Sequence, residues 1–164
     1  MIRFAVIFLL CLAVGFALLL APFTQPPFER ATASLVTVCA FLVRTFGGHA
    51  AAQHNFLMNP VSGYAIEVKD TCNASNVTLM LWAAILAFPS PWIQKLKGLV
   101  AGTLAIHALN LVRIISLFYL GQYNTGWFDF AHLYIWESLI MLGTMVIFSL
   151  WVQRVRVGQP VRPQ

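Results

Sequence analysis

The stretch FAVIFLLCLAVGFALLLA, residues 4–21, decides the fold class of this chain. It contains 18 residues and no charged side chain. As an α-helix it would be about 27 Å long, close to the thickness of the hydrocarbon core of a bilayer. A cleaved signal peptide is the alternative, but such peptides have a shorter apolar region and more positive charge than Arg3 provides. We therefore favour a retained transmembrane helix.

Four more apolar runs follow, at residues 31–46, 74–88, 98–120 and 131–152. Hydrophobic residues make up 60% of the chain and charged residues only 9%, whereas roughly a quarter of the residues in a soluble domain are charged. The sequence thus predicts an all-α integral membrane protein, a single transmembrane domain over residues 1–164 with about five transmembrane helices. The net charge of +5 then reports topology rather than nucleic-acid binding.

One long polar segment, residues 47–73, separates the second apolar run from the third. Turn-forming residues occupy positions 59–63, between an apolar triplet at 56–58 and a roughly alternating run at 64–68. This pattern predicts a small hairpin. The end of the segment is rich in residues that cap helix N-termini, so we expect the third helix to begin there.

Lysine and arginine set the orientation, because basic loops remain on the cytoplasmic side. Six basic residues share that side in a five-span arrangement: Arg30, Lys95, Lys97, Arg154, Arg156 and Arg162. The other side receives the hairpin, the N-terminus, Arg3, Arg44 and Lys69. An even number of spans, with one of the first two runs lying at the interface, is the alternative.

Arg113 stands in the middle of the fourth apolar run. A charged side chain at that depth costs at least ~2.5 kcal/mol on insertion scales, so it usually faces a polar partner or cavity. An arginine that snorkels to the outer interface is the alternative, but Leu120 at the end of the run is about 10 Å away. Asn110 lies on the same helix face and is a natural polar partner for Arg113.

Cys72 and His132 are expected at the same outer face as Arg113. A cysteine before a helix start is placed where the helix dipole stabilises a thiolate, although an inert loop cysteine is the alternative. A histidine at the mouth of the last helix suits general acid–base work, or makes only an interfacial hydrogen bond. Asp129 is placed to orient His132, whereas Glu137 is expected to point elsewhere. We expect no metal or cofactor, because the histidines lack ligand spacing.

A cysteine before a helix, Asn-x-x-Arg-Ile in the next helix and a histidine opening the following one resemble the exosortase/archaeosortase family. Here they are Cys72, residues 110–114 and His132. The resemblance covers about residues 45–150, and the short chain is most like the compact exosortase H type. Members usually have glycine two residues after the cysteine, where this chain has Ala74.

The resemblance implies a cysteine transpeptidase or peptidase in the bacterial cytoplasmic (inner) membrane, a multi-pass protein with its active site facing outward. Its implied partners are exported proteins with a C-terminal sorting signal, namely a short motif, a transmembrane helix and a basic tail. The other implied partners are an unknown acceptor nucleophile and the lipid bilayer. No nucleic-acid partner is expected. Cys72 would be the nucleophile, Arg113 would stabilise the oxyanion and His132 would act as acid and base.

The alternative function is a non-enzymatic membrane scaffold or transporter-like subunit, in which Arg113, Asn110 and Glu137 form a structural network or permeation path. For an enzyme, the outer segment is too short to form a separate peptide-binding domain. We therefore expect an anchored substrate to dock sideways from the bilayer, with the hairpin reading the motif, for example by strand addition at its edge.

Overall fold

The computed structural model describes residues 2–69, 72 and 74–157. The chain forms α1 (Ile2–Leu19), the short helix η1 (Pro22–Thr24), α2 (Gln25–Thr45), β1 (Ala51–Gln53), β2 (Phe56–Met58), β3 (Ala65–Glu67), α3 (Ser75–Ala87), α4 (Trp92–Tyr123), α5 (Thr125–Phe130), the π-helical turn η3 (Ala131–Ile135) and α6 (Trp136–Val157). Three helices are long and apolar enough to cross a membrane: α1, α4 and the continuous helix Thr125–Val157. The predicted helical membrane fold with a small hairpin is confirmed.

The two remaining apolar runs form α2 and α3. Pro26 and Pro27 occupy the first turn of α2, where a missing backbone N–H costs nothing, and so start the helix earlier than residue 31. Helix α3 has 13 residues, about 20 Å of helix, which is shorter than the hydrocarbon core. Neither helix belongs to the set that is long and apolar enough to span alone.

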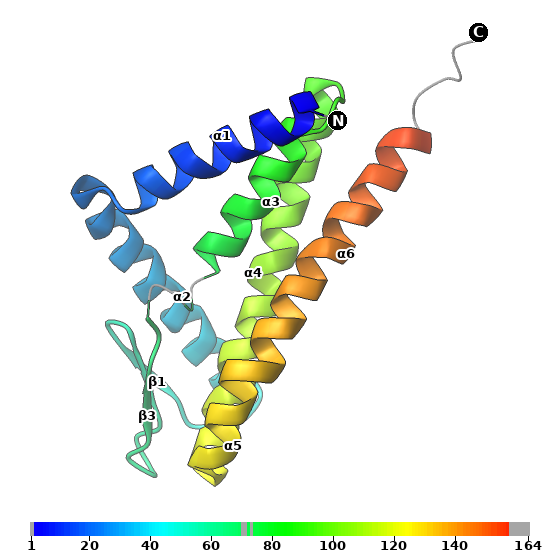
Figure 1. Ribbon diagram of the computed structural model, residues 1–164. Coiled ribbons are helices and arrows are strands. Elements are labelled where there is room, and N and C mark those ends of the chain that lie inside the picture. The colour runs from blue at the N-terminus through cyan, green and yellow to red at the C-terminus, as the bar shows by residue number, and fades with distance from the viewer. Residues whose placement is uncertain (1, 70–71, 73, 158–164) are drawn as a thin grey trace, which may run out of the picture.

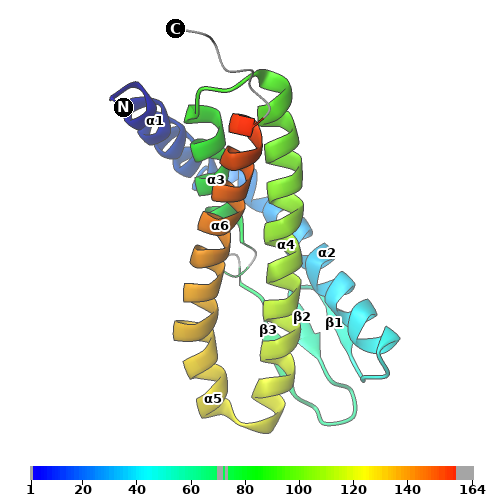
Figure 2. The same cartoon turned by 90° about the vertical axis from the view of Figure 1, so that its right-hand side faces the viewer.

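Figures 1 and 2 show the N-terminus, the α3–α4 turn and the C-terminal end of α6 at one end of the molecule. The sheet and α5 lie at the opposite end. Figure 1 shows α1 crossing the upper part of the molecule and α2 turning sharply away from it at η1 to descend toward the sheet, so the pair leads from one end of the molecule to the other. Arg3, in the first turn of α1, therefore lies at the end that carries Lys95 and Lys97, which favours the alternative with an even number of spans. The proline-rich link turns the chain sharply between α1 and α2.

The polar segment forms a three-stranded antiparallel sheet in the order β1-β2-β3. The predicted hairpin is β2–β3, in which Phe56 pairs with Glu67 and Met58 with Ala65. Strand β1 adds to the far side of β2 and contacts α2. A buried cluster fixes the sheet against α2 and α4; its members include Val36, Val43, Leu57, Ile114 and Phe118. Close packing of these side chains against one another holds the chain leading to Cys72 in place.

The other end of the molecule is held by α3, α4 and α6. Leu81, Ile85 and Ile106 are buried between them. Gly102 lets α4 approach α3 closely, since a Cβ there would meet the side chain of Leu81. This packing sets the height of the first turn of α3 against α4.

Candidate active site

Cys72 and His132 meet although they are 60 residues apart in sequence. The Sγ atom of Cys72 lies 3.4 Å from Nε2 of His132, within the range of a sulfur hydrogen bond. Cys72 stands just before α3 and is half-buried, and His132 belongs to η3. The structure therefore brings together the predicted nucleophile and the predicted acid–base residue.

The ring of His132 is fixed by stacking on Phe128, with centroids 5.7 Å apart and planes 14° from parallel. Asp129, Glu137 and Arg113 all interact with it electrostatically. Among the described residues, no hydrogen bond joins Asp129 to His132. Burial raises the pKa of Tyr64, and the negative charge of Asp129 adds to this rise. Asp129 therefore acts electrostatically on both His132 and Tyr64.

Arg113 is 5% exposed, and one of its terminal nitrogens lies 3.6 Å from Oε2 of Glu137. Its Nε atom has no hydrogen-bond partner in the described part of the chain. Asn110 is fully buried on the same helix, and neither atom of its amide is paired with a described residue. The ion-pair partner of Arg113 is therefore Glu137, and Asn110 is a buried polar group that remains available.

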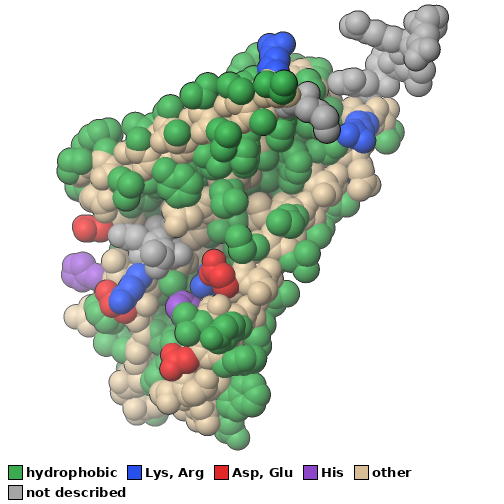
Figure 3. All heavy atoms as spheres, in the orientation of Figure 1, with side chains coloured by type: hydrophobic (Ala, Val, Ile, Leu, Met, Phe, Trp, Pro, Cys, Tyr) green, Lys and Arg blue, Asp and Glu red, His purple; other side chains and the backbone are tan. Residues whose placement is uncertain are grey.

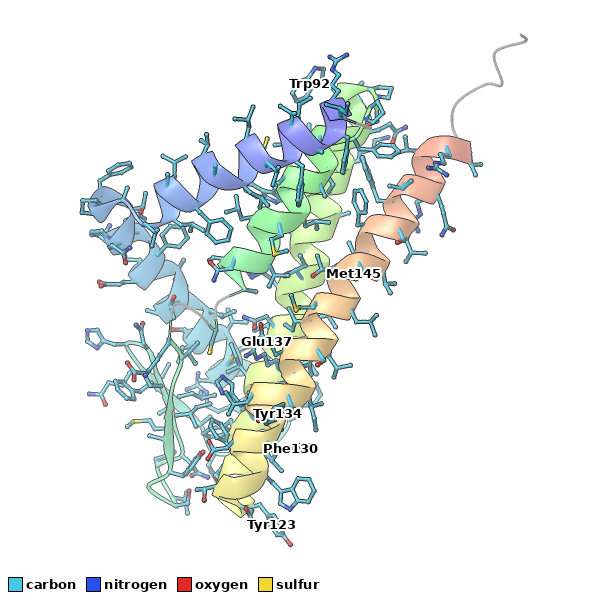
Figure 4. All side chains as sticks on the ribbon, in the orientation of Figure 1. Trp92, Tyr123, Phe130, Tyr134, Glu137 and Met145 are labelled. Atoms are coloured by element: carbon cyan, nitrogen blue, oxygen red, sulfur yellow. The ribbon has the colours of Figure 1, made fainter. Side chains whose placement is uncertain are left out.

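The expectation that Glu137 points elsewhere is wrong, and η3 explains why. The N–H of Trp136 donates to the carbonyl of Ala131, five residues earlier. A π-turn places residues five apart almost above one another, whereas an α-helix would turn them to different faces. His132 and Glu137 are five residues apart and so share one face. Figure 4 shows Glu137 on the side of α6 that faces the rest of the bundle.

Charged and histidine side chains are concentrated around these residues and are few elsewhere on the same face of the molecule. In Figure 3 acidic, basic and histidine side chains cluster between the sheet and α6, below a surface that is almost entirely hydrophobic. The side chain of Glu137 is 57% exposed, so the cluster opens outward on its α6 side.

A separate apolar cavity of about 530 Å³ lies between α1, α2, α3 and α4. Its lining includes Leu19, Leu35, Ser75, Thr78, Trp82 and His107. His107 of α4 is the histidine among these lining residues. The cavity reaches the first turn of α3, three residues beyond Cys72, and none of the three predicted catalytic side chains lines it.

The other cysteines take no part in this arrangement. Cys39 is buried between α2 and the sheet, and Cys11 lies in α1. In the described ranges no group of three or more histidine, cysteine or acidic side chains is placed to hold a metal ion.

The family model described as "Transmembrane exosortase" matches residues 1–152. The match spans α1 to most of α6 and includes every residue of the site. No curated protein and no solved structure matches the chain.

Proposed function

The chain belongs to the transmembrane exosortase family, and from that premise we propose that it is a cysteine transpeptidase or peptidase acting on exported proteins with a C-terminal sorting signal. The observation that carries the proposal is the 3.4 Å contact between Cys72 Sγ and His132 Nε2. A thiol within reach of an imidazole is the arrangement of an activated nucleophile.

In the proposed reaction His132 takes the proton of the Cys72 thiol, and the sulfur attacks the scissile carbonyl carbon. Arg113 stabilises the negative charge that develops on the carbonyl oxygen. The C–N bond breaks, the amine leaves with the proton from His132, and the upstream peptide remains on Cys72 as a thioester. An amine or water then attacks the thioester, again deprotonated by His132, and the thiol is restored.

Glu137 holds Arg113 in this scheme and does not itself touch the substrate. A buried guanidinium needs a counter-charge, and the half-exposed carboxylate supplies it from the neighbouring helix. The unpaired Nε of Arg113 and the amide of Asn110 remain as donors for a bound carbonyl. Both are buried, so a hydrogen bond to a substrate would offset the cost of leaving them unpaired.

The depth of the site supports a substrate anchored in the membrane. From the end with the α3–α4 turn, α3 rises about 20 Å to Ser75 and α4 about 31 Å to Arg113. The hydrocarbon core is about 30 Å thick, so these lengths place the site in the outer third of the core. Basic residues lie at the start of α1, at the start of α4 and at the end of α6, and they make the end with the α3–α4 turn cytoplasmic in this proposal. The site then faces outward.

Processing of an anchored reporter tests the proposal. The reporter is an exported domain that ends in a motif, transmembrane helix and basic tail taken from a protein of the same cell and shown to be cleaved by the wild-type chain. We expect Cys72→Ala to abolish cleavage and Cys11→Ala to leave it unchanged. Cleavage by Cys72→Ala at the wild-type rate would instead favour the non-enzymatic scaffold.

The thioester can be detected directly. Its upstream fragment should migrate with the enzyme on denaturing gels and be released by hydroxylamine. Cys72→Ser should remove this release, because an ester resists mild hydroxylamine treatment. We expect a soluble peptide bearing only the motif to be cleaved far more slowly than the anchored reporter. Equal rates would argue against docking from the bilayer.

A further inference from the structure

The sheet has one free edge on the side of the site. Within the described part of the chain strand β3 pairs only with β2, and Figure 2 shows β1 on the side of α2 and β3 on the opposite side. The chain leaves β3 at Glu67 and reaches Cys72 through a turn in which the N–H of Cys72 donates to the carbonyl of Lys69. The free edge therefore leads directly to the proposed nucleophile.

The register shows which backbone groups face outward. Tyr64 and Val68 exchange hydrogen bonds with the strand β2 side, since the N–H of Asn59 donates to Tyr64 and the N–H of Val68 donates to Asn55. Hydrogen-bonding direction alternates along an antiparallel strand. The N–H and carbonyl groups of Ala65 and Glu67 thus point away from β2. Both residues are exposed, and no backbone hydrogen bond outside the ladder is formed by either within the described ranges.

The edge is also held firmly in place. The amide of Asn59 and the hydroxyl of Ser62 in the β2–β3 turn both donate to Oε1 of Gln122 near the end of α4. The ring of Tyr64 packs against buried Phe118. Because β3 is already ordered in the free enzyme, binding a peptide along it does not require the strand to lose further conformational entropy.

We infer that the free edge of β3 binds the extended segment of the substrate that precedes the scissile bond, as a parallel fourth strand. This inference rests on the proposed function. The exported domain would arrive from the end where the β2–β3 turn lies, and its peptide would run toward Cys72. Strand β3 runs in the same sense, from that turn toward Cys72, so the two strands are parallel.

Strand addition also explains how a short outer segment can read a motif. Main-chain hydrogen bonds to Ala65 and Glu67 supply affinity, and alternate peptide side chains face the sheet surface or the site. A peptide of about six residues is long enough, at about 3.3 Å per residue, to extend from Cys72 along the whole strand.

Proline substitutions can test the role of this edge without disrupting the sheet. Ala65→Pro and Glu67→Pro each remove an outward-pointing N–H and leave the ladder to β2 intact. Ala52→Pro is the matched control, because Ala52 has the same outward orientation on the free side of β1. We expect the two β3 variants to lower reporter cleavage at least tenfold, with Ala52→Pro within twofold of wild type. The rate at which a maleimide labels Cys72 should be unchanged in all three.

Equal cleavage by all three proline variants would overturn the inference and leave the proposed function standing, whereas cleavage by Cys72→Ala would remove the proposed function itself. If a proline variant loses Cys72 labelling, disulfide crosslinking decides instead. In a Cys72→Ala background, Glu67→Cys should trap reporter positions closer to the scissile bond than Ala65→Cys does. The reverse order, or trapping only by Ala52→Cys, would contradict a parallel strand on β3.

Discussion

Ala74 has φ 62° and ψ 12°, in the left-handed region that glycine adopts without strain. Its side chain is buried against Leu81 and Ile106, immediately before the first turn of α3. A non-glycine residue in that conformation costs about 1–2 kcal/mol. Sequences of the family that the chain resembles usually have glycine at this position, and glycine would adopt this backbone conformation without strain.

We expect Ala74→Gly to change the free energy of unfolding by less than about 1 kcal/mol, because relief of strain offsets the lost methyl group and the added chain entropy. Ala83→Gly makes the same chemical change at a buried position inside α3 and should destabilise by about 1–2 kcal/mol. Denaturation in detergent measures both. A loss at Ala74→Gly as large as at Ala83→Gly would mean that the left-handed turn carries little strain.

Arg113→Lys should lower reporter cleavage at least tenfold. The guanidinium can bond Glu137 through one nitrogen while its Nε remains free for a second acceptor, and lysine has no such fork. The labelling rate of Cys72 serves as the control for folding. Near-normal cleavage by Arg113→Lys would show that a positive charge alone suffices.

Glu137→Gln keeps the shape of the side chain and removes its charge. If Glu137 positions Arg113, this variant should lower kcat with little change in KM, because the held guanidinium acts on the transition state. Glu137→Asp should recover part of the loss. Asp129→Asn is the comparison, since Asp129 has no described contact with Arg113. An equal fall in both variants would indicate a general effect of negative charge near His132.

At the scale of elements, patterns along the chain found the helices and the hairpin but not two local features. Strand β1, residues 51–53, has the sequence Ala-Ala-Gln, which carries no strand signal. It forms because β2 offers an edge and α2 a surface. The π-turn η3 has no sequence signature either, and it brings Glu137 to the face of His132, where Glu137 pairs with Arg113. The polar site residues were recognisable because ionisable groups in apolar runs demand partners.

The π-turn leads to a prediction about deletions. Removing Leu133, which is exposed within η3, should convert the turn to an ordinary α-helix in which His132 and Glu137 are four apart and still share a face. Removing Leu142, equally exposed in regular α6, rotates one half of the helix against the other by about 100°. We expect the first deletion to keep at least a tenth of reporter cleavage and the second to abolish it. Complete loss in both would show that the π geometry itself is required.

At the scale of the whole molecule, the apolar runs predicted where the helices lie, whereas the path that α1 and α2 follow together was not evident from the sequence. Residues 4–21 look like an independent span, and the prolines that follow look like a reversal. In the structure α1 and α2 share one passage, since α2 continues toward the sheet. The direction in which α2 leaves α1 depends on the backbone conformation at η1, and neither the composition nor the hydrophobic periodicity of the sequence predicts that conformation.

Four passages, by α1 with α2, α3, α4 and α5–α6, return the chain to the side where it began. The N-terminus should then face the cytoplasm, together with the start of α4 and the end of α6. That side would carry the basic residues Arg3, Lys95, Lys97, Arg154 and Arg156. Arg44 and Lys69 then remain on the outer side, whereas the five-span arrangement also places Arg3 there, against the positive-inside rule. Single cysteines can test it in a chain whose native cysteines are replaced by alanine. A membrane-impermeant maleimide should label Lys69→Cys in intact cells, and should label Arg3→Cys and Arg154→Cys only after the membrane is opened. Labelling of Arg3→Cys in intact cells, with Arg154→Cys still protected, would restore the odd number of crossings and require α1 to turn away from the end where it now lies.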